Sequence, residues 1–71
     1  MNMDYNQIQL GKIRSIDYKK GVGEITTNIQ NFMFTIDNIL TEEKLFVGDV
    51  VRFRGELVQN VPKAFFVDKV K

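Results

Sequence analysis

The chain has 71 residues, enough for one domain, and its ten lysines and arginines against nine aspartates and glutamates give a formal net charge of +1. It contains neither cysteine nor histidine, which excludes disulfides, thiolate-bound zinc and catalysis by a thiol or an imidazole. No apolar run approaches the roughly 20 residues of a membrane-spanning helix, and the polar, acidic segment 1–7 is unlike a signal peptide. We therefore expect a single domain over residues 1–71, with 1–7 as a flexible extension, located in the cytoplasm and not in a membrane.

Apolar residues recur mostly at every second position, which is typical of β-strands. Five segments bounded by turn residues show this alternation, at 8–16, 22–27, 32–36, 50–58 and 64–70. Gly11, inside the first segment, indicates a bulge or bend, and Gly21 suits a turn that needs a positive φ. Residues 28–31 are expected to form a hairpin connection, 59–63 a loop, and 41–44 at most a short helical turn.

Five short strands predict a small antiparallel barrel, because closure removes the exposed edges that an open sheet would leave. Oligonucleotide/oligosaccharide-binding (OB) barrels and SH3-like barrels both fit, and strand spacing does not choose between them. Phe32, Phe34 and Phe53 lie at period-two positions and are expected to fill the barrel. Phe65 and Phe66 are adjacent in the last segment, so one should face the core and the other the solvent.

Short motifs follow one another along nearly the whole chain. Residues 11–14 read Gly-Lys-Ile-Arg, 19–25 read Lys-Lys-Gly-Val-Gly-Glu-Ile, and 32–36 read Phe-Met-Phe-Thr-Ile. Gly-Asp-Val-Val-Arg-Phe at 48–53 and Pro-Lys-Ala-Phe-Phe-Val at 62–67 complete the series. This ordered set resembles the cold-shock domain of bacterial cold-shock proteins. The resemblance implies an all-β, five-stranded antiparallel barrel of the OB type that binds single-stranded nucleic acid.

The resemblance separates the core from the binding surface. The positions that the family uses for its core keep apolar residues: Ile13, Ile25, Phe32, Phe34, Val51, Phe53 and Val67. The positions at which the family stacks bases on aromatic rings hold other residues: Ser15, Val22, Glu24, Met33, Thr35 and Ile36. Because each stacked base contributes about 1–3 kcal/mol, the resemblance implies a divergent member whose nucleic-acid affinity is lower by orders of magnitude.

Five residues remain as candidates for contacts with nucleic acid. Lys12, Arg14 and Lys20 lie at or near positions where the family has basic residues, and phosphate contacts by them would weaken with salt. The alternative interpretation, given equal weight, is that they are solvated strand and turn residues. Tyr18, at the first turn, and Phe66, the outward residue by the family pattern, are the candidates for stacking. A plain turn tyrosine and an isolated exposed phenylalanine are the structural alternatives for these two.

We therefore predict weak, salt-sensitive binding of single-stranded RNA or DNA through the face of the first three strands. The alternative is a barrel used for protein–protein interaction or self-association, because Val22, Met33 and Ile36 would make that face aliphatic. A peptide-binding SH3-like barrel would need an exposed aromatic groove, which we cannot assemble from this sequence. The carboxylates are dispersed and no glycine-rich phosphate loop occurs, so we expect no enzyme activity, no metal and no cofactor.

Overall fold

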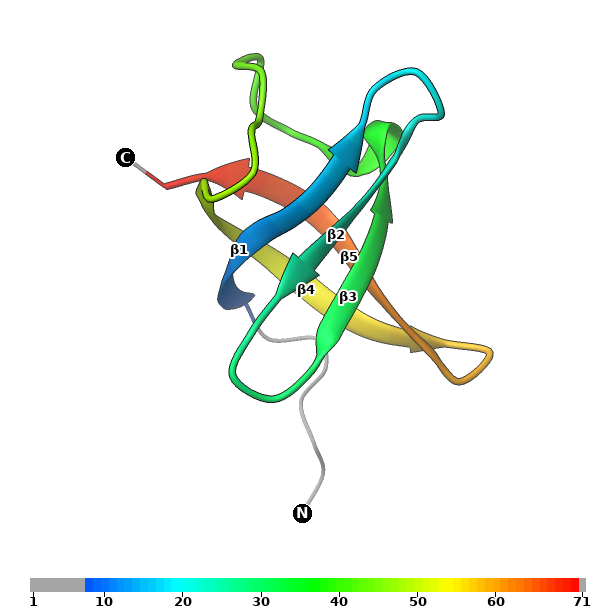
Figure 1. Cartoon of the computed structure of the whole chain (residues 1–71). Helices are drawn as coiled ribbons and strands as arrows, with labels where there is room; N and C mark the ends of the chain where they lie inside the picture. The colour runs from blue at the N-terminus through cyan, green and yellow to red at the C-terminus, as the bar shows by residue number, and fades with distance from the viewer. Residues whose placement is uncertain (1–7, 71) are drawn as a thin grey trace.

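The computed structural model describes residues 8–70. The predicted extension at 1–7 lies outside the described residues. The elements are β1 (Ile8–Asp17), β2 (Val22–Thr26), β3 (Asn31–Thr35), the 3₁₀ helix η1 (Ile36–Asn38), β4 (Val50–Val58) and β5 (Val61–Lys69). The strands close into a barrel in the order β1-β2-β3-β5-β4, which confirms the predicted five-stranded barrel (Figure 1).

All neighbouring strands pair antiparallel except β3 and β5. These two run parallel and meet at Met33 and Lys63. The figure shows β1, β2 and β3 as a continuous meander, followed by the long loop that leads into the β4–β5 hairpin (Figure 1). The meander and the hairpin are therefore two locally paired units that the barrel joins edge to edge.

The core is apolar throughout and follows the predicted alternation. Its buried side chains are Ile13, Ile25, Phe32, Phe34, Leu45, Val51, Phe53, Ala64 and Val67. The seven predicted core residues are confirmed, and Leu45 and Ala64 are added to them. The rings of Phe32 and Phe53 meet with centroids 5.0 Å apart and planes tilted by 59°, a favourable arrangement for two aromatic rings.

Gly23 makes room for one of these core rings. A Cβ added at Gly23 would lie 2.7 Å from Cε1 of Phe34 and 2.9 Å from the carbonyl oxygen of Ser15. Real Cβ atoms do not approach other atoms so closely. The Phe34 ring can therefore pack against β2 only at a residue without a side chain. The inward position of Gly23 leaves its neighbours Val22 and Glu24 on the outer surface of β2.

Two turn predictions have different outcomes. Gly21 has a φ of 76°, as expected for the turn between β1 and β2. The predicted loop at 59–63 is wrong, because β5 begins at Val61 and leaves only Gln59 and Asn60 outside the strands. Their φ values of 52° and 68° are both left-handed, which matches the two-residue turns that join tightly twisted hairpins.

The bulge expected at Gly11 lies three residues further on, because the β1–β2 register shifts between Ile13 and Ser15. Gly11 instead permits a close strand contact, since an added Cβ would lie 2.6 Å from Cγ2 of Ile25. The helical turn expected at 41–44 is also wrong. Within residues 8–70 the helical residues are those of η1, and none of the described helices is long and apolar enough to span a membrane.

Candidate functional site

The surface that the sequence analysis singled out is the outer face of the meander, here called the β1–β3 face. It comprises the outward residues of the three strands from Lys12 onward: Lys12, Arg14, Ser15, Asp17, Val22, Glu24, Thr26, Asn31, Met33 and Thr35. Ser15, Glu24 and Met33 lie opposite one another across the three strands. This face therefore carries two acidic side chains, Asp17 and Glu24, two basic ones, Lys12 and Arg14, and no aromatic ring.

Arg14 stands out from this face because of the β1 bulge. The shift in register between Ile13 and Ser15 makes Arg14 the extra residue, and both Arg14 and Ser15 face solvent. Nη1 of Arg14 donates a hydrogen bond to Oε1 of Glu24 at 3.1 Å. The Arg14 side chain is 58% exposed, so this ion pair contributes at most about 1 kcal/mol and can exchange for a phosphate contact.

Lys12 and Lys20 lie at the two ends of the same strand-and-turn segment. Lys12 faces Thr26 of β2, and Lys20 lies in the β1–β2 turn. Oδ1 of Asp17 shapes this turn by accepting the backbone N–H groups of Lys19 and Lys20, each at 3.0 Å. Among the ion pairs found in residues 8–70, none involves Lys12 or Lys20. The structure thus places Lys12 and Arg14 on the β1–β3 face and Lys20 in the turn that follows β1.

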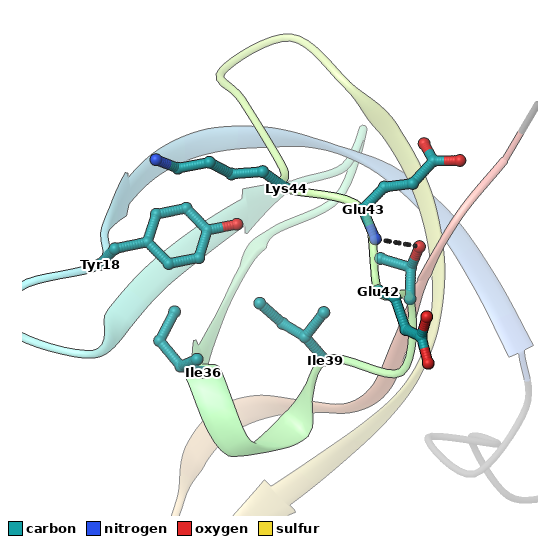
Figure 2. A pocket seen from close by; sticks show the side chains of 7 residues that line it. Tyr18, Ile36, Ile39, Glu42, Glu43 and Lys44 are labelled. Carbon is teal, nitrogen blue, oxygen red and sulfur yellow. Dashed lines mark hydrogen bonds between the residues drawn. The ribbon is translucent and has the colours of Figure 1, made fainter.

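Tyr18 has a structural role that the sequence analysis did not foresee. Its hydroxyl oxygen accepts the N–H of Leu45 at 2.7 Å, which fixes the long loop to the first turn. Nζ of Lys44 lies 5.1 Å from the centre of the Tyr18 ring. Tyr18 and Lys44 line an open pocket of about 430 Å³ together with Ile36 and Ile39. Figure 2 shows these four side chains around the pocket. The Tyr18 ring remains partly exposed, but the ammonium group of Lys44 already lies over one face of it.

The predicted aliphatic surface is only partly assembled. Val22 and Met33 line an open, mainly apolar groove of about 520 Å³, whereas Ile36 lies in the Tyr18 pocket instead. The sequence analysis missed Val61 and Phe65, which line the groove from β5. They reach it through the parallel β3–β5 contact, and no local sequence pattern signals that contact.

Phe65 and Phe66 depart from simple alternation. The β4–β5 register shifts between Arg54, opposite Phe65, and Arg52, opposite Asp68, so Phe66 lies in a bulge. Phe66 is exposed as expected, but the expectation that its neighbour would be core is wrong, because Phe65 is only half-buried. Phe66 lies on the outer surface of β4 and β5, and the β1–β3 face does not include it.

Phe46 and Val47 form an exposed apolar pair that the sequence analysis did not single out. They belong to a turn that is hydrogen-bonded to β1, because Gly48 N–H donates to the Ile13 carbonyl at 2.9 Å and Ile13 N–H donates to the Asp49 carbonyl at 2.9 Å. The pair therefore lies beside the edge of β1 that carries Arg14. The sequence feature that could have indicated this exposed pair is two apolar residues directly before the turn residues Gly48 and Asp49.

Comparisons with known proteins give the fold class. No family model matches the sequence, and no curated protein matches it. Among solved structures, the chain is similar to Drosophila Unr CSD456, with a TM-score of 0.78 and 17% sequence identity. The match covers 93% of this chain and 28% of that chain, so this chain spans little more than a quarter of its neighbour's length. The fold is that of a cold-shock domain, a closed five-stranded barrel of the OB type.

Proposed function

We propose that this chain binds single-stranded nucleic acid, weakly and in a salt-sensitive manner, through the β1–β3 face. The observation that carries the proposal is the placement of Lys12, Arg14 and Lys20 on one segment of an OB-type barrel. OB barrels bind oligonucleotides on this side of the barrel, and basic side chains along such a surface bind the phosphate backbone. Two of the three cations lack an acidic partner within residues 8–70.

The chemistry of this face favours contact with the backbone over recognition of bases. Lysine and arginine bind phosphates whatever the sequence, whereas base recognition needs stacking surfaces and polar groups directed at base edges. The central positions of the face hold Ser15, Glu24 and Met33, and Glu24 repels a polyanion. We therefore expect little sequence preference, and we expect Glu24 to lower the affinity.

Fluorescence anisotropy of end-labelled oligo-dT and oligo-U at low and physiological salt tests the proposal. Changing Arg14 and Lys20 to Ala should weaken binding and reduce the salt dependence, because fewer counterions are released. Glu24→Gln should tighten binding about two- to fivefold, because it frees Arg14 from an exposed ion pair.

Asp37→Asn is the matched control for Glu24→Gln, because it changes the net charge equally at an exposed position of η1. A tighter complex with Glu24→Gln than with Asp37→Asn would locate the binding surface on the β1–β3 face. Equal effects would show that only the net charge matters. Absence of binding at low salt would contradict the proposal.

The apolar groove supports a second candidate function, protein–protein interaction or self-association. Val22, Met33 and Phe65 line it together and leave apolar side chains in contact with solvent. Light scattering over a concentration series tests self-association directly. A mass that rises with concentration, and that returns to the monomer value with Met33→Lys, would support it. A strict monomer would exclude the homodimer.

A further inference from the structure

Phe66 adopts a backbone conformation that its side chain disfavours. Its φ of 56° lies in the left-handed region, where glycine and asparagine are favoured and a bulky residue is an outlier. The bulge between the pairs Arg54–Phe65 and Arg52–Asp68 imposes this conformation. Phe66 is 52% exposed and is not among the buried core residues. The packing of the barrel therefore gives no reason for an aromatic residue at this position.

Two arginines accompany the exposed ring. The guanidinium carbon of Arg54 lies 5.4 Å from the centre of the Phe66 ring, within the range of a cation–π contact. No ion pair in residues 8–70 involves Arg54, and Arg52 has only a long contact of 3.9 Å from Nη2 to Oδ2 of Asp68. Exposed aliphatic residues of β1 pair with both arginines and complete what we call the Phe66 patch: Ile8, Leu10, Arg52, Arg54 and Phe66.

We propose that the Phe66 patch is a second contact surface for single-stranded nucleic acid, in which a base stacks on the Phe66 ring and Arg52 and Arg54 bind phosphates. This inference rests on the proposed function and extends it to another side of the barrel. The patch combines cations with an exposed ring, and the ligand that matches both is a polyanion with planar bases.

The two surfaces are continuous along β1. Leu10 and Lys12 both face outward on this strand, with Leu10 opposite Arg52 of β4 and Lys12 opposite Thr26 of β2. A bound strand that crosses β1 at Lys12 therefore reaches the Phe66 patch from the β1–β3 face. This path supplies a stacking ring to a binding surface whose central positions have none.

The test compares an oligo-dT of about 12 nucleotides, within the site sizes of OB folds, with an abasic strand of the same length. Phe66→Asn removes the ring and suits the left-handed backbone, so the variant is expected to fold. It should bind oligo-dT about tenfold more weakly, the loss expected for one stacked base, and it should bind the abasic strand as the unchanged protein does. Phe66→Tyr keeps a ring and should retain binding. Ile29→Asn, at a position 87% exposed in the β2–β3 connection, is the control for loss of an apolar side chain.

The possible results distinguish binding by the β1–β3 face alone from binding that also involves the Phe66 patch. Oligo-dT binding that falls with the Arg14 and Lys20 variants but not with Phe66→Asn would overturn this inference alone. Equal losses on oligo-dT and on the abasic strand would overturn stacking, because the contribution of Phe66 would then not depend on the bases. No binding of oligo-dT by the unchanged protein would overturn both this inference and the proposed function.

Discussion

Replacing Gly23 by alanine should destabilise the barrel through a steric conflict that the structure locates. The new methyl group would lie 2.7 Å from Cε1 of Phe34 and 2.9 Å from the carbonyl oxygen of Ser15. The phenylalanine ring can shift, but the carbonyl is held in the β1–β2 ladder. Overpacking of this kind costs about 1–3 kcal/mol. The total stability expected for a chain of this length is only about 4–10 kcal/mol, so the loss is large.

Thermal unfolding followed by circular dichroism should show a Tm lower by about 5–20 °C, since each kcal/mol shifts a domain of this size by about 4–8 °C. Adding Phe34→Leu to Gly23→Ala should recover part of the loss, because the smaller side chain leaves room for the methyl group. Gly48→Ala is the contrasting control: an added Cβ would meet nothing within 4 Å, so any loss of Tm there comes from backbone strain at a φ of 96° and should not be recovered by Phe34→Leu. A Tm unchanged by Gly23→Ala, or strictly additive effects in the double variant, would refute the steric explanation.

Two further predictions concern the turns. Tyr18→Phe removes the acceptor of the Leu45 N–H, so stability should fall by about 1 kcal/mol and hydrogen exchange of the Leu45 amide should accelerate; unchanged exchange would mean that the hydroxyl does not hold the loop. Changing Gln59 to Asn and Asn60 to Gly should raise the Tm, because both positions have left-handed φ values that the Asn-Gly pair adopts more readily. A lower Tm in that variant would show that the Gln59 or Asn60 side chain stabilises the hairpin in another way.

The strands and the core could be predicted because they depend on a local pattern. Ile13, Phe32 and Val51 recur at positions that point inward whenever the chain is extended, and the structure confirms them as buried. Gly21 could be predicted for a similar reason, because a tight turn with positive φ selects glycine whatever surrounds it. These features follow from the backbone geometry of a few consecutive residues.

The features that the sequence did not reveal depend on contacts between distant segments. The bulges at Arg14 and Phe66 interrupt the alternation without a glycine to mark them. The alternation therefore predicts a core position for Phe65, which is only half-buried. The sequence predicts that Ile36 lies on the same aliphatic surface as Val22 and Met33. It lies elsewhere because β3 ends at Thr35, and the sequence does not show where the strand ends. The basic residues Lys12, Arg14 and Lys20 could be found from the sequence because they lie on one strand and the turn that follows it, and their effect on nucleic-acid binding stays a prediction.

The parallel contact between β3 and β5 has a consequence for cooperativity. It is the shortest ladder of the barrel, with the single pair Met33–Lys63, aided by the Leu40 N–H that donates to the Val67 carbonyl at 2.7 Å. Opening of the barrel should begin there, since the fewest backbone hydrogen bonds must break while the meander and the hairpin stay paired. The apolar groove spans this seam, with Met33 on one side and Phe65 on the other. A ligand bound in the groove would therefore contact only the closed barrel. Its binding would stabilise the closed barrel, and opening of the barrel would lower its affinity.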